Sequence, residues 1–227
     1  MSDLGYRLKR FLYQEFIPVT KGVALGSGLV TLVLFILARL NLDFSPWVAL
    51  FPGEFPRTPW TLLTYPLFDQ SLFSFLFALL WLWFVGGSLE RTWGGRRYAL
   101  LLLAVTLITG LVMSLVGWFV GGMVPIYGLW LPLVGLTWAW AETDPYREVL
   151  FWGIIPLKAR WLAWLDAILI FTMYLPVHFL MGAASLSGIL AFYLFRGRGS
   201  AGGYGGGSRN RWNSQNRFRR GRLRVIK

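Results

Sequence analysis

The sequence predicts an all-α polytopic membrane protein, built as a bundle of six transmembrane helices. Of its 227 residues, 56% are hydrophobic and only 14% are charged, a balance typical of membrane-spanning chains and not of soluble domains. Residues 98–141 contain no Asp, Glu, Lys or Arg. Because one crossing needs about 20 residues, this uncharged stretch predicts a helical hairpin.

Charged or turn-forming residues divide the apolar sequence into six spans. A loop rich in Pro, Trp and Phe (41–69) separates the first span from the second, and Arg96 and Arg97 precede the third. A short link leads to the fourth span, a polar patch and a basic stretch (142–160) lead to the fifth, and Pro176 marks the turn into the sixth. The expected spans are residues 22–40, 70–89, 98–117, 123–141, 161–175 and, after Pro176, up to residue 195.

The distribution of basic residues predicts the orientation. Residues 196–227 hold ten Lys and Arg and no acid, whereas the other 195 residues hold twelve Lys and Arg against ten acids. An even number of spans places both termini on one side, which then carries twenty basic residues, and only Arg39 and Arg57 remain on the other. Since basic residues favour the cytoplasmic side, we expect cytoplasmic termini, with residues 1–21 as a cytoplasmic N-terminal segment and no cleaved signal.

The tail, residues 196–227, is rich in Gly and Arg and cannot bury enough apolar surface to fold alone. We expect it to lie in the cytoplasm, disordered, against anionic lipids, where each basic residue contributes about 1 kcal/mol. RNA or ribosome contact and a protein partner are alternatives, since Arg interleaved with Gly and aromatic residues also suits phosphate contact and base stacking. The tail residues expected to bind lipid or phosphate include Arg209, Arg211, Arg217, Arg219, Arg220, Arg222 and Arg224.

Several chemistries have no residues to support them. The chain has no cysteine, which excludes disulfides and thiolate catalysis. It has no zinc-ligand spacing, phosphate loop or dinucleotide fingerprint, so we expect neither metal nor cofactor. Most of the thirteen Trp residues lie near predicted span ends, as expected of an aromatic belt at the membrane interfaces, and we assign them no chemical role.

Four motifs in order resemble the rhomboid family of membrane proteins. Residues 78–90 (Ala-Leu-Leu-Trp-Leu-Trp-Phe-Val-Gly-Gly-Ser-Leu-Glu) resemble the family's second helix nearly residue for residue, and residues 59–64 (Pro-Trp-Thr-Leu-Leu-Thr) resemble the approach to it. Residues 135–145 are similar to the end of the fourth helix, and residues 151–162 to the cytoplasmic turn of bacterial rhomboids. The resemblance implies a six-helix rhomboid-like membrane domain over residues 22–195. The family-type structural residues are Trp60, Gly86, Gly87, Glu90, Trp93, Gly94, Gly128, Gly135 and Gly188.

The same resemblance implies that the protease site is missing. Rhomboid proteases use a serine at the start of the fourth helix and a histidine in the sixth, with a histidine and an asparagine of the second helix as oxyanion donors. These positions fall on Tyr127, Met181, Ser74 and Ala78. A hydroxyl needs a base within about 2.6–3.2 Å to become a nucleophile, and each lost oxyanion donor costs about 10²–10³ in rate. We therefore expect an inactive member of the family.

Three further polar residues need an interpretation. His178, the only histidine, lies about one turn before the family's position, and Ser185 is roughly 10 Å further along the helix, too far for a catalytic pair. We expect His178 to be a polar residue near the outer interface and Asp69 to be solvated. Asp166 lies inside the fifth span, where an acid is often functional, and pairing with Lys158 or Arg160 is the alternative.

The first functional hypothesis is a rhomboid-like pseudoprotease, similar to the derlins, that binds transmembrane clients or partner proteins without cleaving them, in membrane-protein quality control or scaffolding. The alternatives are a structural subunit or assembly factor of a larger membrane complex, and a rhomboid-family serine protease with a non-standard site. We expect an integral protein of the bacterial cytoplasmic membrane.

Overall fold

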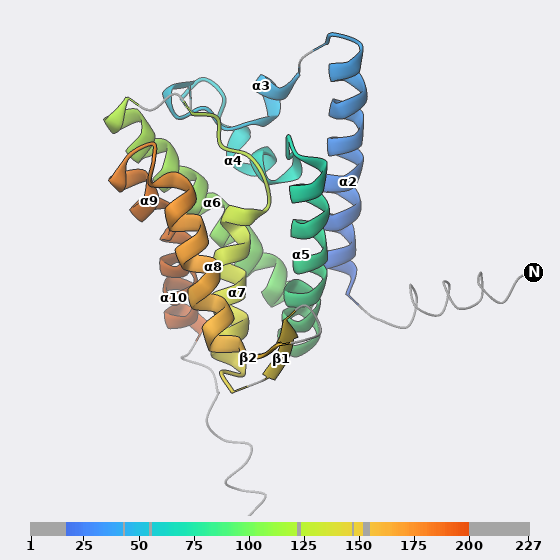
Figure 1. The fold of residues 1–227 in the computed structure, drawn as a ribbon, viewed down its shortest axis with the longest axis vertical. Helices are drawn as coiled ribbons and strands as arrows, with labels where there is room; N and C mark the ends of the chain where they lie inside the picture. The colour runs from blue at the N-terminus through green and yellow to red at the C-terminus, as the bar shows by residue number, and fades with distance from the viewer. Residues whose placement is uncertain are drawn as a thin grey trace, which may run out of the picture. The chain divides into compact units, whose positions relative to one another are not determined.

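A computed structural model describes residues 17–42, 44–54, 56–121, 124–146, 148–151 and 155–199, and most of these are helical (Figure 1). The predicted N-terminal segment and basic tail fall almost entirely outside this part of the chain, so the domain boundaries stay predictions. The main helices are α2 (Pro18–Arg39), α5 (Leu72–Trp93), α6 (Gly95–Val120), α7 (Trp130–Thr143), α8 (Ala159–Tyr174), α9 (Phe179–Ser185) and α10 (Ser187–Gly199).

Four helical segments are long and apolar enough to cross a membrane: α2, α5, α6 and Phe179–Gly197, which joins α9 to α10. They coincide with the first, second, third and sixth predicted spans. Helix α7 has 14 residues and α8 has 16, fewer than the roughly 20 that a full crossing needs. The prediction of a polytopic helical membrane protein is confirmed, whereas the number of six crossings stays a prediction.

Helix α7 begins later than predicted, because the chain before it is not helical. Ile126 pairs with Leu50, in the loop between α2 and α5, through two backbone hydrogen bonds of 2.9 Å. Gly128 has a φ of +95°, a backbone conformation that favours glycine, and its N–H donates to the Tyr65 carbonyl at 2.9 Å. Ile126, Gly128 and Leu129 of this stretch are buried, so other parts of the protein cover much of its backbone.

Helix α7 is the central helix of the bundle. Ten of its 14 residues are buried, and it packs against α5, α6 and α8 (Figure 1). At Gly135 a Cβ atom would lie 2.6 Å from the backbone oxygen of Gly188 in α10, so both glycines permit a close backbone approach.

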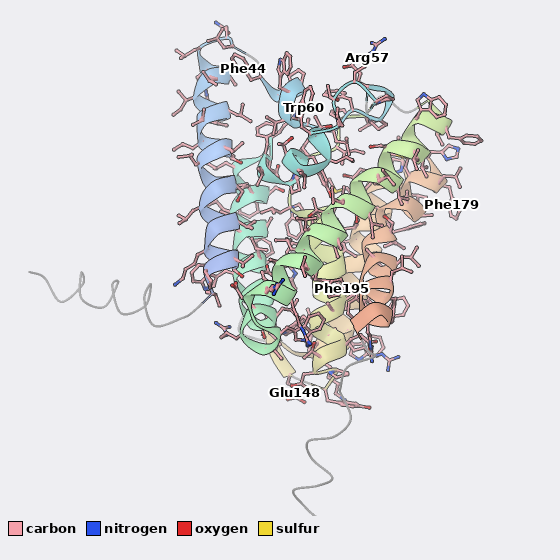
Figure 2. The ribbon with its side chains drawn as sticks, turned by 180° about the vertical axis from the view of Figure 1, so that it is seen from behind. Phe44, Arg57, Trp60, Glu148, Phe179 and Phe195 are labelled. Atoms are coloured by element: carbon pink, nitrogen blue, oxygen red, sulfur yellow. The ribbon has the colours of Figure 1, made fainter. Side chains whose placement is uncertain are left out.

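The loop between α2 and α5 folds over one end of this bundle. It contains two short helices, α3 (Ser45–Val48) and α4 (Thr61–Thr64), and two 3₁₀ turns, η1 (Pro52–Glu54) and η2 (Tyr65–Leu67). Figure 2 shows Arg57 and Trp60 of this loop at the end opposite Glu148. A shared core joins the loop to the bundle, formed by Leu50, Tyr65, Met113, Ile126, Leu131, Val134, Ala167, Ile170, Tyr174, Met181 and Ala184.

The expectation of a purely helical fold is wrong at the opposite end. There β1 (Glu148–Phe151) pairs antiparallel with β2 (Ile155–Lys158), with Glu148 opposite Lys158 and Phe151 opposite Ile155. Both strands contain consecutive apolar residues, several of them β-branched, which favour an extended backbone. This hairpin leads directly into α8, whose first residue is Ala159.

Candidate functional site

A polar site at the N-terminal end of α5 is built around a buried acid. Asp69 is 5% exposed, so the prediction that it is solvated is wrong. Its Oδ1 accepts a hydrogen bond from the Ser71 N–H at 3.0 Å, and its Oδ2 accepts one from the Ser74 hydroxyl at 3.0 Å. The Trp130 indole N–H, from the first residue of α7, donates to the Ser74 oxygen at 2.9 Å. Ser74 is therefore held as a structural link between α5 and α7.

Tyr127 lies at the same site, in the loop before α7. Its hydroxyl donates to the Gln70 side-chain oxygen at 3.0 Å, and its ring lies against Phe68, with 6.1 Å between the ring centroids. Partial burial, and to a smaller extent the negative charge of Asp69, raises the pKa of Tyr127 above its ordinary value. A phenol is protonated at neutral pH even without this rise, and here it acts as a hydrogen-bond donor to Gln70.

Two other positions of the family's protease site hold apolar residues, Met181 and Ala78. Met181 is fully buried in the apolar core, and Ala78 on α5 is fully buried as well. His178 is exposed and caps α9, since its Nδ1 atom accepts the Leu180 N–H at 3.1 Å. Among the residues that the structure describes, no serine hydroxyl is hydrogen-bonded to His178. Ser185, the serine in the same helical segment, donates to the Gly182 carbonyl at 2.7 Å.

Comparison with known proteins supplies the family. Residues 23–196 match a family described as "Eukaryotic integral membrane protein (DUF1751)". The chain belongs to this family. It is also 28% identical over 148 residues to the rhomboid protease GlpG of Pectobacterium atrosepticum, covering 63% of this chain and 52% of the relative. The GlpG of Salmonella newport is 26% identical over 177 residues, covering 72% of this chain and 62% of the relative.

These similarities place the chain in the rhomboid superfamily, as its motifs predicted. The chain spans about half to three fifths of the length of the GlpG relatives that it matches. The matched family is described as eukaryotic, so it gives no support to a bacterial cytoplasmic membrane. The broader prediction, that this rhomboid-like chain is an integral membrane protein, is confirmed.

The family-type residues of this rhomboid-like chain lie mainly where helices meet or end. Gly86 faces the Tyr98 ring, Gly94 joins α5 to α6 with a φ of +82°, and the Trp93 ring stacks on Phe192 at 6.4 Å. Their placement supports a role in packing.

Glu90 holds the start of α2. Its carboxylate, 2% exposed, accepts hydrogen bonds from the N–H groups of Val19 and Thr20 at 2.8 Å each and from the Thr20 hydroxyl at 2.7 Å. Pro18 has no N–H, and the Lys21 N–H donates to the Ile17 carbonyl at 3.1 Å. The side chain of one helix thus satisfies the open donors at the N-terminus of another.

The seam between α5 and α7 was missed by the sequence reasoning. Besides the bond from Trp130 to Ser74, the Trp81 indole donates to the Thr137 hydroxyl at 3.0 Å, and the Trp140 indole donates to the Ser88 hydroxyl at 3.2 Å. These three Trp residues therefore have a structural role as hydrogen-bond donors between helices. The α5 partners lie at positions 74, 81 and 88, a spacing of seven that marks one helix face and could have indicated the seam.

Asp166 makes no ion pair with any residue that the structure describes. It is 7% exposed, while Lys158 and Arg160 are exposed, and no residue of the described chain forms a salt bridge with its carboxyl. The alternative of local pairing with Lys158 or Arg160 is therefore wrong in this structure.

Proposed function

We propose that this rhomboid-like protein binds transmembrane segments of client or partner proteins and does not cleave them. The observation that carries the proposal is that the serine and the histidine nearest to the family's catalytic positions are hydrogen-bonded to structural partners. Ser74, the serine closest to the family's site, is bonded to Asp69 and Trp130, and His178 caps a helix at an exposed position. Both groups that could form a catalytic pair have structural partners.

The remaining base near Ser74 is unsuited to peptide hydrolysis. That base is the Asp69 carboxylate and not an imidazole, and the Ser74 oxygen also accepts the Trp130 indole N–H. Tyr127 stands where the family has its nucleophile, and Ala78 offers a methyl group where an oxyanion donor is needed. Without activation and oxyanion stabilisation, the site retains only binding.

The binding surface that we propose is the face on which α5 and α8 flank α7. Both helices pack on α7, and no extensive contact between the described parts of α5 and α8 joins them to each other. The large exposed side chains on this pair of helices are Leu72, Phe73, Leu76, Leu80 and Phe84 of α5, and Trp161, Trp164, Leu165, Ile168, Leu169 and Met173 of α8. A client helix has apolar side chains to pack against on both flanks.

The finer topology belongs to this proposal. We infer six crossings, with α7 and α8 as the fourth and fifth, and both termini in the cytoplasm, on the support of the basic-residue asymmetry. Helix α7 is only about 21 Å long at about 1.5 Å per residue, which suffices because other helices cover it. The basic tail then lies at the cytoplasmic surface, where it binds anionic lipid.

Site-specific crosslinking tests the binding. A photo-crosslinking amino acid replaces Leu80 of α5, Leu165 of α8 or Leu25 of α2, which are 66%, 43% and 75% exposed. In native membranes we expect discrete protein adducts at positions 80 and 165 and few at position 25. Equal yields at all three positions would contradict the proposed face. A single stoichiometric adduct that survives detergent and salt would instead favour a structural subunit of a larger complex.

A further inference from the structure

The carboxyl of Asp166 is buried with an open acceptor. Its Oδ2 atom is hydrogen-bonded to no residue that the structure describes. The Thr137 hydroxyl of α7 lies within hydrogen-bonding reach of this carboxyl. Yet that hydroxyl has one proton, which it donates to the Leu133 carbonyl at 2.8 Å, while its oxygen accepts the Trp81 indole N–H at 3.0 Å. Thr137 can serve Asp166 as a donor only by giving up its backbone bond.

The described residues supply no donor to the Asp166 Oδ2 atom, so we look for one in a second protein. A buried polar atom without a hydrogen bond is destabilising, and an ionised carboxylate inside a bilayer requires a cation or several donors. Lys158 and Arg160 are both exposed and form no ion pair with it. A basic side chain would supply an ionised Asp166 with both a counter-charge and hydrogen-bond donors.

The position of Asp166 specifies the depth of that side chain. Asp166 is the eighth residue of α8, so it lies about 10 Å from the end of the helix next to β2, at about 1.5 Å per residue. This is about one third of the way across a hydrocarbon core of about 30 Å. Thr137 and Trp81 bring α7 and α5 to the same level.

We propose that Asp166 anchors one Lys or Arg side chain of a transmembrane segment that docks on α7 between α5 and α8. The inference rests on the proposed function and names the class of client: an apolar helix with a single basic residue about one third of the way in from the β1–β2 end. In lipid such a residue would have to extend its charge to the interface, whereas Asp166 offers it a counter-charge at its own depth.

The test uses the full chain in phosphatidylcholine vesicles, with a photo-crosslinking amino acid in place of Ile168, which is 58% exposed on α8. Three designed segments are compared: polyleucine, polyleucine with one Lys at the matched depth, and the same Lys moved by two residues to the opposite helix face. Each is tested against the unchanged chain, Asp166→Asn and Asp166→Leu. Thr172→Val, which removes an exposed hydroxyl of the same helix, is the matched control.

We expect the matched Lys to raise the crosslinking yield about threefold to thirtyfold over polyleucine, the range expected for a polar contact between membrane helices. The gain should persist in Thr172→Val, fall in Asp166→Asn and vanish in Asp166→Leu. Should Asp166→Leu fail to fold, the reduced gain in Asp166→Asn carries the test.

Two results would overturn the inference. If polyleucine crosslinks well but Lys adds nothing, or adds as much on the opposite face, the binding surface stands and the role of Asp166 is wrong. If none of the segments crosslinks in any variant, the proposed function and this inference both fail.

Discussion

The Glu90 carboxylate should be the main attachment of the first turn of α2 to α5. Helix α2 buries only Thr20, Ser27 and Thr31 of its 22 residues, and Glu90 accepts three hydrogen bonds from its first turn. A hydrogen bond to a charged group contributes about 1.5–3 kcal/mol, and bonds that share one carboxylate do not add fully. Glu90→Ala should therefore lower the free energy of unfolding by about 3–5 kcal/mol.

Two variants separate the parts of this interaction. Thr20→Val removes one of the three bonds while keeping the side-chain shape, so it should cost about 1–2 kcal/mol. Glu90→Gln keeps the shape but turns an amide N–H₂ toward a backbone N–H, and should cost about 2–4 kcal/mol. Glu54→Gln, at an exposed glutamate of η1, is the control and should stay within about 0.5 kcal/mol of the unchanged chain.

The assay is reversible unfolding in mixed micelles, with limited proteolysis of α2 as a second readout. Glu90→Ala should both unfold more easily and release α2 for cleavage. If Glu90→Gln and Glu90→Ala match the Glu54→Gln control in both measurements, the Glu90 carboxylate does not hold α2 in place.

Three further predictions concern the packing and the polar site. Gly135→Ala places a Cβ 2.6 Å from a backbone oxygen of α10 and should destabilise the bundle by more than about 2 kcal/mol in the same unfolding assay. Trp81→Phe removes the indole donor to Thr137 and should lower the unfolding free energy by about 0.6–2 kcal/mol. Asp69→Asn removes a negative charge near Tyr127, so the pKa of the phenol should fall toward its ordinary value, as measured by NMR titration of labelled tyrosine.

Matched controls exist on the exposed surface. Gly26→Ala on α2 meets nothing within 4 Å and should not lower stability, since alanine favours the helix by up to about 1 kcal/mol. Trp118→Phe, at a side chain that is 68% exposed, should cost less than Trp81→Phe. Equal losses at exposed and buried positions would show that the helix contacts described here do not carry the stability. A Tyr127 pKa that is unchanged or higher in Asp69→Asn would contradict the electrostatic account of that site.

The parts of the fold that depend on local composition were predictable. Apolar runs bounded by Arg and Lys gave the positions of α2, α5 and α6 to within a few residues. The start of α7 was not predictable, because Ile126 pairs with Leu50, far away in the chain, and this pairing keeps residues 124–129 extended or turned. The apolar sequence of this stretch is equally compatible with a helix.

The candidate site, too, was predictable from the sequence only in part. Motif order identified Ser74, Tyr127 and Met181 as the positions of interest, and the structure brings the first two together around Asp69. Burial of Asp69 could not be read from the sequence, because it arises where the start of α7 meets α5. The isolation of Asp166 likewise depends on how Thr137 uses its single proton.

We propose that no hydroxyl in the described part of this bundle is activated as a nucleophile. The most direct test reconstitutes the purified protein in liposomes with a labelled transmembrane substrate and treats it in parallel with a fluorophosphonate probe. We predict neither a cleavage product nor a labelled serine. A product that disappears in Ser74→Ala or His178→Ala, with labelling of the same serine, would contradict the account.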